Sequence, residues 1–230
     1  MDNYRPKKTS SRPLLLFLAL VIFLISGTFS FAQENRRKAW LAELSEIEKQ
    51  VNAFIPDPAY PDDPFILVTL KEAIEGSREE NGGIGACLVR EATGEIVERG
   101  HNRQFEPYYR SDLHAEMDLL TRYEDRIKAV RPGGRGNPST AETRKMGGLV
   151  LYTSVEPCPM CLTRIINTGL KKVLHAAPDE TGGMAQRISG LPPFWQNMAK
   201  DNVYQAANCS PELIVISKRL FRPMSIKKVY

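Results

Sequence analysis

Hydrophobic residues recur along the chain with two spacings, and these spacings predict alternating helices and strands. Apolar positions three or four residues apart predict a helix over residues 65–80. Residues 112–127 are predicted to form a second helix. Between them, short apolar segments over residues 84–90 and 95–101 predict two strands, and the Thr-Gly pair that separates them suits a tight hairpin turn. The first half of this region is therefore expected to be helix, hairpin, helix.

The second half of the chain continues the alternation. In chain order we expect a buried strand over Leu149–Tyr152, a helix that begins near Cys158 and ends at Gly169, strands over 171–176 and 204–208, and a final helix that opens with Ser210 and Pro211. Together these elements predict an α/β domain over residues 65–230. Its expected architecture is a three-layer αβα sandwich with a mixed five-stranded sheet.

The N-terminal 64 residues do not fit this pattern. Residues 1–32 combine a basic start, an unbroken apolar segment over Leu14–Ile25 and small residues at Ser30 and Ala32, so they predict either a cleaved signal peptide or a retained membrane anchor. Both interpretations predict a protein that is exported to the periplasm or medium, or tethered to a membrane. Residues 33–64 are expected to form an extra helix over 34–54 and a proline-rich linker.

The charges of the chain nearly balance when residues 1–32 are left out of the count. The chain has 31 basic and 27 acidic residues, and residues 1–32 hold four of the former and one of the latter, which leaves 27 and 26. A protein that binds a large polyanion normally has a clearly basic face. The balance therefore favours a small-molecule partner over a nucleic acid.

Two short motifs contain the candidate chemistry. His114-Ala115-Glu116 opens the second predicted helix, for which Asp112 is a candidate N-cap, and Pro157-Cys158-Pro159-Met160-Cys161 leads from a predicted strand into a predicted helix. Two thiolates and one imidazole form a zinc site whose fourth position stays open to water. Glu116, two residues after the histidine, would face that water if both residues act from the first helical turn.

Two other interpretations of the cysteine pair are open. It could be half of a structural zinc site or a redox-active dithiol. The first lacks a second Cys-x-x-Cys, because only Cys87 and Cys209 remain and they are far apart in sequence. The second has no use for the His-x-Glu motif.

The paired motifs His-Ala-Glu and Pro-Cys-Pro-Met-Cys resemble those of the cytidine-deaminase-like zinc deaminases. The two motifs are most similar to those of the branch of guanine deaminases, cytosine deaminases and tRNA adenosine deaminases. The resemblance covers about residues 65–222. It implies the αβα fold, a homodimer, Zn²⁺ held by His114, Cys158 and Cys161, and Glu116 as the catalytic proton carrier. It also implies that Asn102 binds the substrate.

The same region departs from its relatives at two places. The tRNA-type members usually have Asp-Pro-Thr before the histidine motif, where this chain has Arg110-Ser111-Asp112-Leu113. In the loop before it, Phe105, Tyr108 and Tyr109 would either stack on a base or pack within the loop. An insertion rich in glycine, proline and serine over 131–148 would be a lid, an interface arm or disordered.

These observations predict a zinc-dependent hydrolytic deaminase of a nucleobase or nucleoside, with guanine first and cytosine next. An exported enzyme would not meet cytosolic tRNA, which also favours a small substrate. The alternatives are a tRNA adenosine deaminase-like enzyme and a non-catalytic, secreted zinc-binding module.

Overall fold

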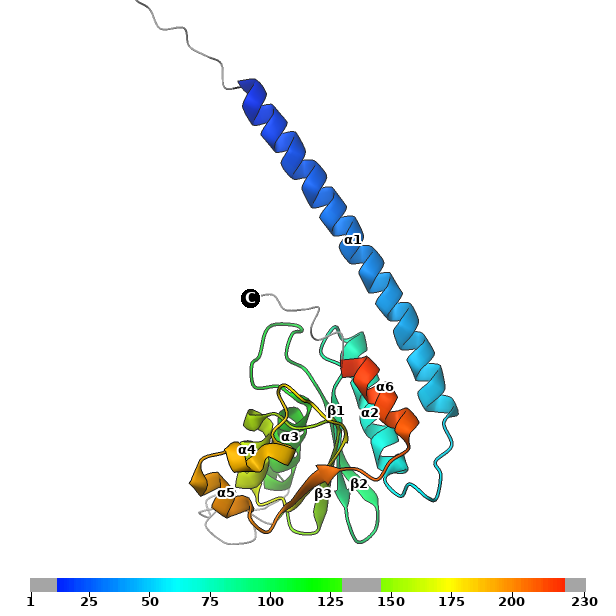
Figure 1. Cartoon of the computed structure of the whole chain (residues 1–230), viewed down its shortest axis with the longest axis vertical. Helices are drawn as coiled ribbons and strands as arrows, with labels where there is room; N and C mark the ends of the chain where they lie inside the picture. The colour runs from blue at the N-terminus through cyan, green and yellow to red at the C-terminus, as the bar shows by residue number, and fades with distance from the viewer. Residues whose placement is uncertain (1–11, 130–145, 222–230) are drawn as a thin grey trace, which may run out of the picture. The chain divides into compact units, whose positions relative to one another are not determined.

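A computed structural model describes residues 12–129 and 146–221 of the chain, with the side chains of 12–30 and 128–129 left out (Figure 1). Residues 1–11 of the predicted leader over 1–32 and residues 131–145 of the insertion over 131–148 lie outside the described residues, whereas the backbone of 12–32 is helical. Whether the leader is cleaved or retained, and what the insertion does, stay predictions. In the part of the chain that the structure describes, no helix is both long and apolar enough to cross a membrane.

The chain divides into two units, Met1–Ser45 and Glu46–Tyr230. The first contains most of α1 (Arg12–Ala53), a continuous helix whose C-terminal part is the helix predicted over 34–54. The end of α1 belongs to the second unit, in which Ile47 and Val51 are buried and Gln50 accepts a hydrogen bond from Arg219.

The second unit contains the elements that the hydrophobic pattern predicts, with two additions. In chain order they are α2 (Asp63–Arg78), β1 (Gly85–Arg90), β2 (Glu95–His101), α3 (Ala115–Ala129), β3 (Leu149–Val155), α4 (Pro159–Thr168), β4 (Lys172–Ala177), the 3₁₀ helix η1 (Ala185–Gly190), α5 (Pro193–Ala199), β5 (Val203–Ala206) and α6 (Pro211–Phe221). The short helices η1 and α5 were not predicted.

The five strands form one mixed sheet in the order β2-β1-β3-β4-β5, which confirms the predicted fold class. β1 is antiparallel to both of its neighbours, and β3, β4 and β5 are parallel to one another. It follows that β2, β3, β4 and β5 all end at the same edge of the sheet. In α/β sheets, ligands bind beyond the carboxyl ends of the strands, so this edge is where a site is expected.

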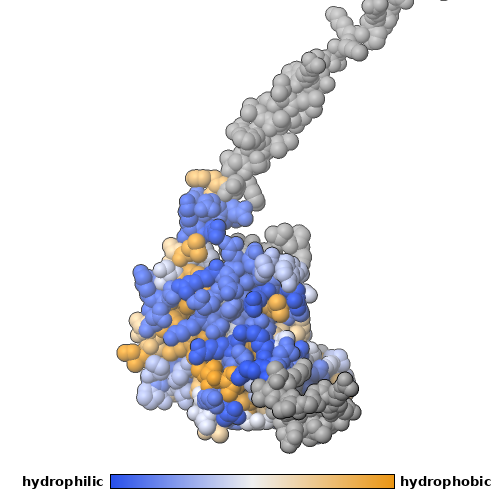
Figure 2. Space-filling model, turned by 180° about the vertical axis from the view of Figure 1, so that it is seen from behind, coloured by the Kyte–Doolittle hydropathy of each residue, from blue (hydrophilic) through white to orange (hydrophobic). Residues whose placement is uncertain are grey.

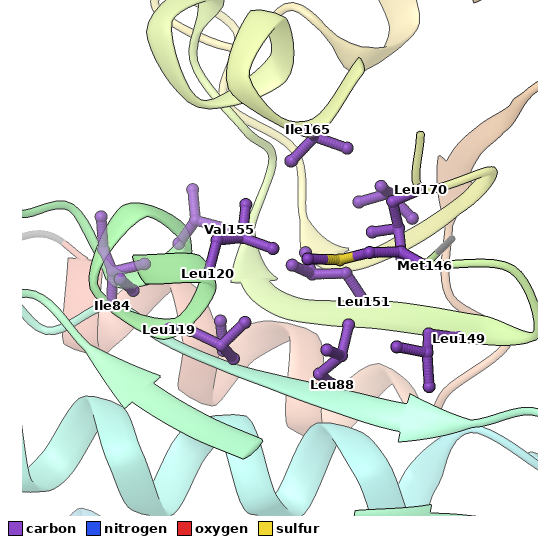
Figure 3. Close-up of a cluster of buried hydrophobic side chains, with 13 residues drawn as sticks. Ile84, Leu88, Leu119, Leu120, Met146, Leu149, Leu151, Val155, Ile165 and Leu170 are labelled. Carbon is purple, nitrogen blue, oxygen red and sulfur yellow. The ribbon is translucent and has the colours of Figure 1, made fainter. Parts of the chain in front are cut away.

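Helices cover both faces of the sheet, with α2 and α6 on one side and α3, α4 and α5 on the other (Figure 1). One core cluster lies between the sheet and the α3 and α4 layer (Figure 3). Its fully buried members include Leu88 and Leu151 from the strands and Leu119 and Ile165 from the helices. The face in Figure 2 is largely hydrophilic, with separate apolar areas.

Close packing and buried polar contacts hold the opposite layer. Gly85 at the start of β1 lies so close to α2 that a Cβ there would be 2.1 Å from the carbonyl oxygen of Thr69. The buried carboxylate of Asp63 accepts hydrogen bonds from the backbone N–H of Ser210 at 2.6 Å and from its hydroxyl at 2.5 Å. These contacts join the start of α2 to the start of α6.

The outer edge of β2 has donors for its carbonyl groups. Guanidinium groups of Arg122 and Arg126, on α3, donate to the backbone carbonyls of Arg99 and Val97. Side chains of the neighbouring helix thus bind the two carbonyls to which a further strand would pair.

Candidate active site

Two helix N-termini bring the predicted chemistry together. α3 begins at Ala115, so His114 stands directly before the helix and Glu116 is its second residue. α4 begins at Pro159 with Cys158 as its N-cap, and Cys161 lies in the first turn. The expected N-cap at Asp112 is wrong: its carboxylate instead makes two exposed hydrogen bonds with Arg110, at 2.7 and 2.8 Å, and α3 starts three residues later.

His114, Cys158 and Cys161 form a cluster with the geometry of a metal site. The two sulfur atoms are 3.6 Å apart, and His114 Nδ1 lies 3.7 Å from Cys158 Sγ and 3.6 Å from Cys161 Sγ. Zinc binds sulfur at about 2.3 Å and imidazole nitrogen at about 2.0–2.1 Å, so a tetrahedral ion would set these separations at about 3.8 Å and 3.6 Å. The three ligand atoms therefore fit Zn²⁺, with one tetrahedral position left for another ligand.

The electrostatics of the cluster favour a thiolate at Cys158. A hydrogen bond from Cys161 lowers the pKa of Cys158 to about 4, and His114 contributes to the effect. The same bond, together with burial, raises the pKa of Cys161 well above its usual range. The hydrogen bond with Cys158 also raises the pKa of His114. Zinc binding would displace the remaining proton, because thiolates and neutral imidazole are the forms that bind the metal.

Glu116 is a buried carboxyl group beside this cluster. Burial raises the pKa of Glu116, and the charge of Cys158 adds to that shift. Thr153, near the end of β3, has its hydroxyl oxygen 3.4 Å from Glu116 Oε1 and 3.1 Å from the carbonyl oxygen of Val155, so its one proton has two acceptors within reach. A carboxyl group with a raised pKa can both accept and return protons near neutral pH, as a general acid and base must.

Asn102 follows directly after β2, at the same edge of the sheet as the cysteine motif. The side chain is fully buried, and Oδ1 accepts hydrogen bonds from the backbone N–H of Gly82 at 3.3 Å and of Gln104 at 3.0 Å. Nδ2 is buried and has no hydrogen-bond partner. The oxygen therefore stabilises the local turn, while the amide nitrogen is a free donor.

The loop that joins Asn102 to His114 is held by Asn81. The backbone N–H groups of Phe105 and Glu106 both donate to Asn81 Oδ1, at 2.7 and 3.0 Å. Tyr108 and Tyr109 are exposed, and the ring of Tyr109 lies 6.1 Å from that of Phe105. The two tyrosines are thus displayed to solvent on an ordered loop and do not pack into the domain.

Sequence reasoning did not predict the structural role of Glu156. This buried carboxylate accepts hydrogen bonds from the backbone N–H of Asp179 at 3.2 Å and of Gln186 at 3.0 Å, and so holds the segment after β4 against the cysteine motif. An acidic residue at the end of an otherwise fully buried strand is the signal that could have indicated it. The four cysteines are free thiols, so Cys87 and Cys209 are not paired.

Comparisons with known proteins agree with this geometry. The model of the family described as the cytidine and deoxycytidylate deaminase zinc-binding region matches residues 61–177. That range contains all five predicted site residues. A tRNA-specific adenosine deaminase of Bacillus subtilis (strain 168) is 32% identical over 130 residues, which cover 56% of this chain and 70% of the relative.

Solved structures share the fold at lower identity. One, from a study of A-to-I editing by tRNA:A34 deaminases at the wobble position of transfer RNA, is 22% identical, with a TM-score of 0.52 over 68% of this chain and 98% of the other. A guanine deaminase from Nitrosomonas europaea is 18% identical, with a TM-score of 0.51 over 75% and 91%.

Proposed function

Because the chain belongs to the family of the cytidine and deoxycytidylate deaminase zinc-binding region, and is thus a zinc-dependent hydrolytic deaminase, we propose that it removes the exocyclic amine of a purine base. The observation that carries the proposal is the buried carboxyl group of Glu116 beside three side chains that fit zinc. A purely structural metal site has no use for that carboxyl group, since burying it beside the charge of Cys158 costs free energy.

The protein supplies the metal ligands, and zinc would act as the Lewis acid. His114, Cys158 and Cys161 would hold the ion at the N-termini of α3 and α4, where helix dipoles favour the negative charge of the thiolates. When bound, zinc lowers the pKa of water at its open position to about 7. The three ligands leave that position free for the reaction.

Glu116 is the group that moves protons in this proposal. Its carboxylate accepts a proton from the attacking water and delivers it to the ring nitrogen next to the carbon under attack. A second proton passes through the same group to the amine, which leaves as ammonia, and the carbon retains the oxygen as a carbonyl. Thr153 would orient the carboxylate when its hydroxyl proton points to Oε1 and not to the carbonyl of Val155.

Asn102 would bind the base. Its free Nδ2 can donate a hydrogen bond to a ring nitrogen or carbonyl oxygen of the substrate, and a buried donor without a partner favours a ligand that supplies the acceptor. The two backbone N–H groups on Oδ1 fix the orientation of the amide. Binding would thereby give the unpartnered amide nitrogen an acceptor.

A free base such as guanine is our first candidate. The nearly balanced charge of residues 33–230 supports it, because nothing in the composition favours a polyanion. A second candidate is adenosine within tRNA, and the observation that favours it is the 32% identity to a tRNA-specific adenosine deaminase. The two candidate substrates differ in what is attached to the base: a free base has no ribose, whereas adenosine in tRNA has a ribose and the rest of the RNA chain.

The test is ammonia release by the protein from Gln33 onward, with guanine, adenine, cytosine, their nucleosides and a tRNA anticodon stem as substrates. We expect the Glu116→Gln variant to keep zinc and lose turnover. Glu124→Gln is a matched control: this carboxylate lies on the same helix and pairs with Arg164. Full activity in Glu116→Gln would refute the proton-carrier role, and zinc binding without ammonia release from any substrate would favour a non-catalytic module.

A further inference from the structure

His101 connects the residue that we expect to bind the substrate to helix α2. It is the last residue of β2 and directly precedes Asn102, and its side chain is 15% exposed. Nδ1 lies 3.0 Å from Glu72 Oε2 and Nε2 lies 3.1 Å from Glu79 Oε2. Both ring nitrogens therefore contact carboxylates, one near the middle of α2 and one at its C-cap.

This geometry has a consequence for the protonation of the ring. A neutral imidazole has one N–H donor, whereas an ionised carboxylate has only acceptors. Two carboxylate contacts are both hydrogen bonds only when the ring has a proton on each nitrogen. Burial acts to lower the pKa of His101, but the hydrogen bonds to Glu72 and Glu79 outweigh it and raise the pKa above its usual value.

One further charged group acts on the ring from the opposite layer. Asp118 of α3 is buried and interacts electrostatically with His101. The same carboxylate also pairs with Arg122 at 2.9 Å and with Arg103 at 3.8 Å. The carboxylates around His101 thus come from two helices, and the two on α2 make the direct contacts.

The contacts of His101 fix the backbone that orients Asn102. Glu79 begins the turn that continues to Gly82, and the N–H of Gly82 donates to Asn102 Oδ1 at 3.3 Å. Gly76 lies close beneath both residues, since a Cβ there would be 3.3 Å from the carbonyl oxygen of Asn102 and from His101 Cβ. A change in the distance between this turn and β2 would therefore change the orientation of the amide.

We propose that His101, as an imidazolium bridging Glu72 and Glu79, is a positioning residue that holds Asn102 with its amide nitrogen available to substrate. The proposal rests on the substrate role of Asn102 given above. Because the pKa of His101 is raised, the bridge is complete below that pKa and loses one hydrogen bond as the pH rises through it. Substrate binding should weaken over the same interval, and the chemical step should not.

The chain offers a closely matched pair of variants. Glu79→Gln removes the charge from one side of the bridge, and Glu75→Gln, one turn earlier, changes a carboxylate that pairs with Arg78; both side chains are 52% exposed. At pH 7 we expect Glu79→Gln to raise KM roughly fivefold with kcat changed by less than about twofold, and Glu75→Gln to match the wild type. The alkaline limb of kcat/KM should move to lower pH in Glu79→Gln and be absent in His101→Gln.

Nitrogen NMR of the zinc-loaded protein gives a readout that does not depend on turnover. Only three histidines need assignment, and His101→Gln identifies the signal. We expect protons on both ring nitrogens at pH 6.5 and a lower titration midpoint in Glu79→Gln. A singly protonated ring at that pH would overturn the proposal, as would an unchanged KM and alkaline limb in Glu79→Gln of an enzyme that deaminates normally. An absence of ammonia release in the wild type would instead count against the proposed function.

Discussion

Exchanging Asn102 for aspartate changes one atom of the candidate site and leaves its shape intact. Oδ1, which accepts from the N–H groups of Gly82 and Gln104, is retained, and the buried, unpartnered Nδ2 becomes an oxygen. In its ionised form the new side chain keeps the acceptor that holds the turn, lacks the donor that we assign to the substrate, and adds a negative charge. The substitution therefore tests the role of the amide nitrogen separately from that of the amide oxygen.

The size of the effect follows from these contacts. A lost hydrogen bond from the amide costs about 0.5–1.5 kcal/mol, and a buried oxygen that faces an acceptor without a partner adds about 1–3 kcal/mol. A total of about 2–4 kcal/mol in transition-state stabilisation corresponds to a decrease in kcat/KM of roughly 30- to 1000-fold. The fold should survive, because both backbone donors keep their acceptor.

Initial rates of ammonia release measure this decrease, with zinc content and the urea midpoint recorded on the same preparation. Asn202→Asp is the control: this asparagine lies outside the turn that holds Asn102, and its Nδ2 donates to the hydroxyl of Tyr204 at 2.6 Å. We expect kcat/KM of the control to stay within about threefold of the wild type. If Asn102→Asp did the same, Asn102 would have no role in binding.

Three further substitutions test the packing and the metal site. Gly85→Ala should reduce the free energy of unfolding in urea by about 2–3 kcal/mol, because the added Cβ meets backbone; Gly190→Ala, which has open space around it, should change it by less than about 0.5 kcal/mol, and equal losses would contradict the packing argument. Asp63→Ala should cost about 2–4 kcal/mol, since it removes the acceptor of both Ser210 donors, and a loss below about 1 kcal/mol would rule out that role. Cys161→Ala should lower zinc from about one ion per chain to less than about a tenth by elemental analysis; retained zinc would exclude the proposed ligand set.

The hydrophobic pattern predicted the sheet well because its strands obey simple local rules. β1 and β2 were expected over 84–90 and 95–101, and Gly94 between them adopts the positive φ of 70° that a tight turn favours. Likewise Gly169, with φ of 78°, ends α4 as expected. At these positions the local backbone requirement and the fold agree.

Other parts depend on contacts that the sequence does not reveal. Asp112 is a residue type that often caps helices, but its carboxylate pairs with Arg110 and does not cap α3, which starts later. α5 was missed although Pro193 occupies its first position, because its seven residues are too few for a hydrophobic periodicity to show. The sequence could not reveal the separate roles of Oδ1 and Nδ2 in Asn102 or the bridge from His101 to α2. The partners in these contacts lie far away in sequence.

The guanidinium groups on the outer edge of β2 have a consequence for how the folded protein behaves at high concentration. A terminal strand with free carbonyls is a template onto which another molecule can add its own strand, and such growth leads to fibrils. The guanidinium groups of Arg122 and Arg126 occupy two of those carbonyls and are themselves paired with Asp118 and Glu98. An approaching strand would have to displace both guanidinium groups, so this side of the sheet disfavours pairing with a second molecule.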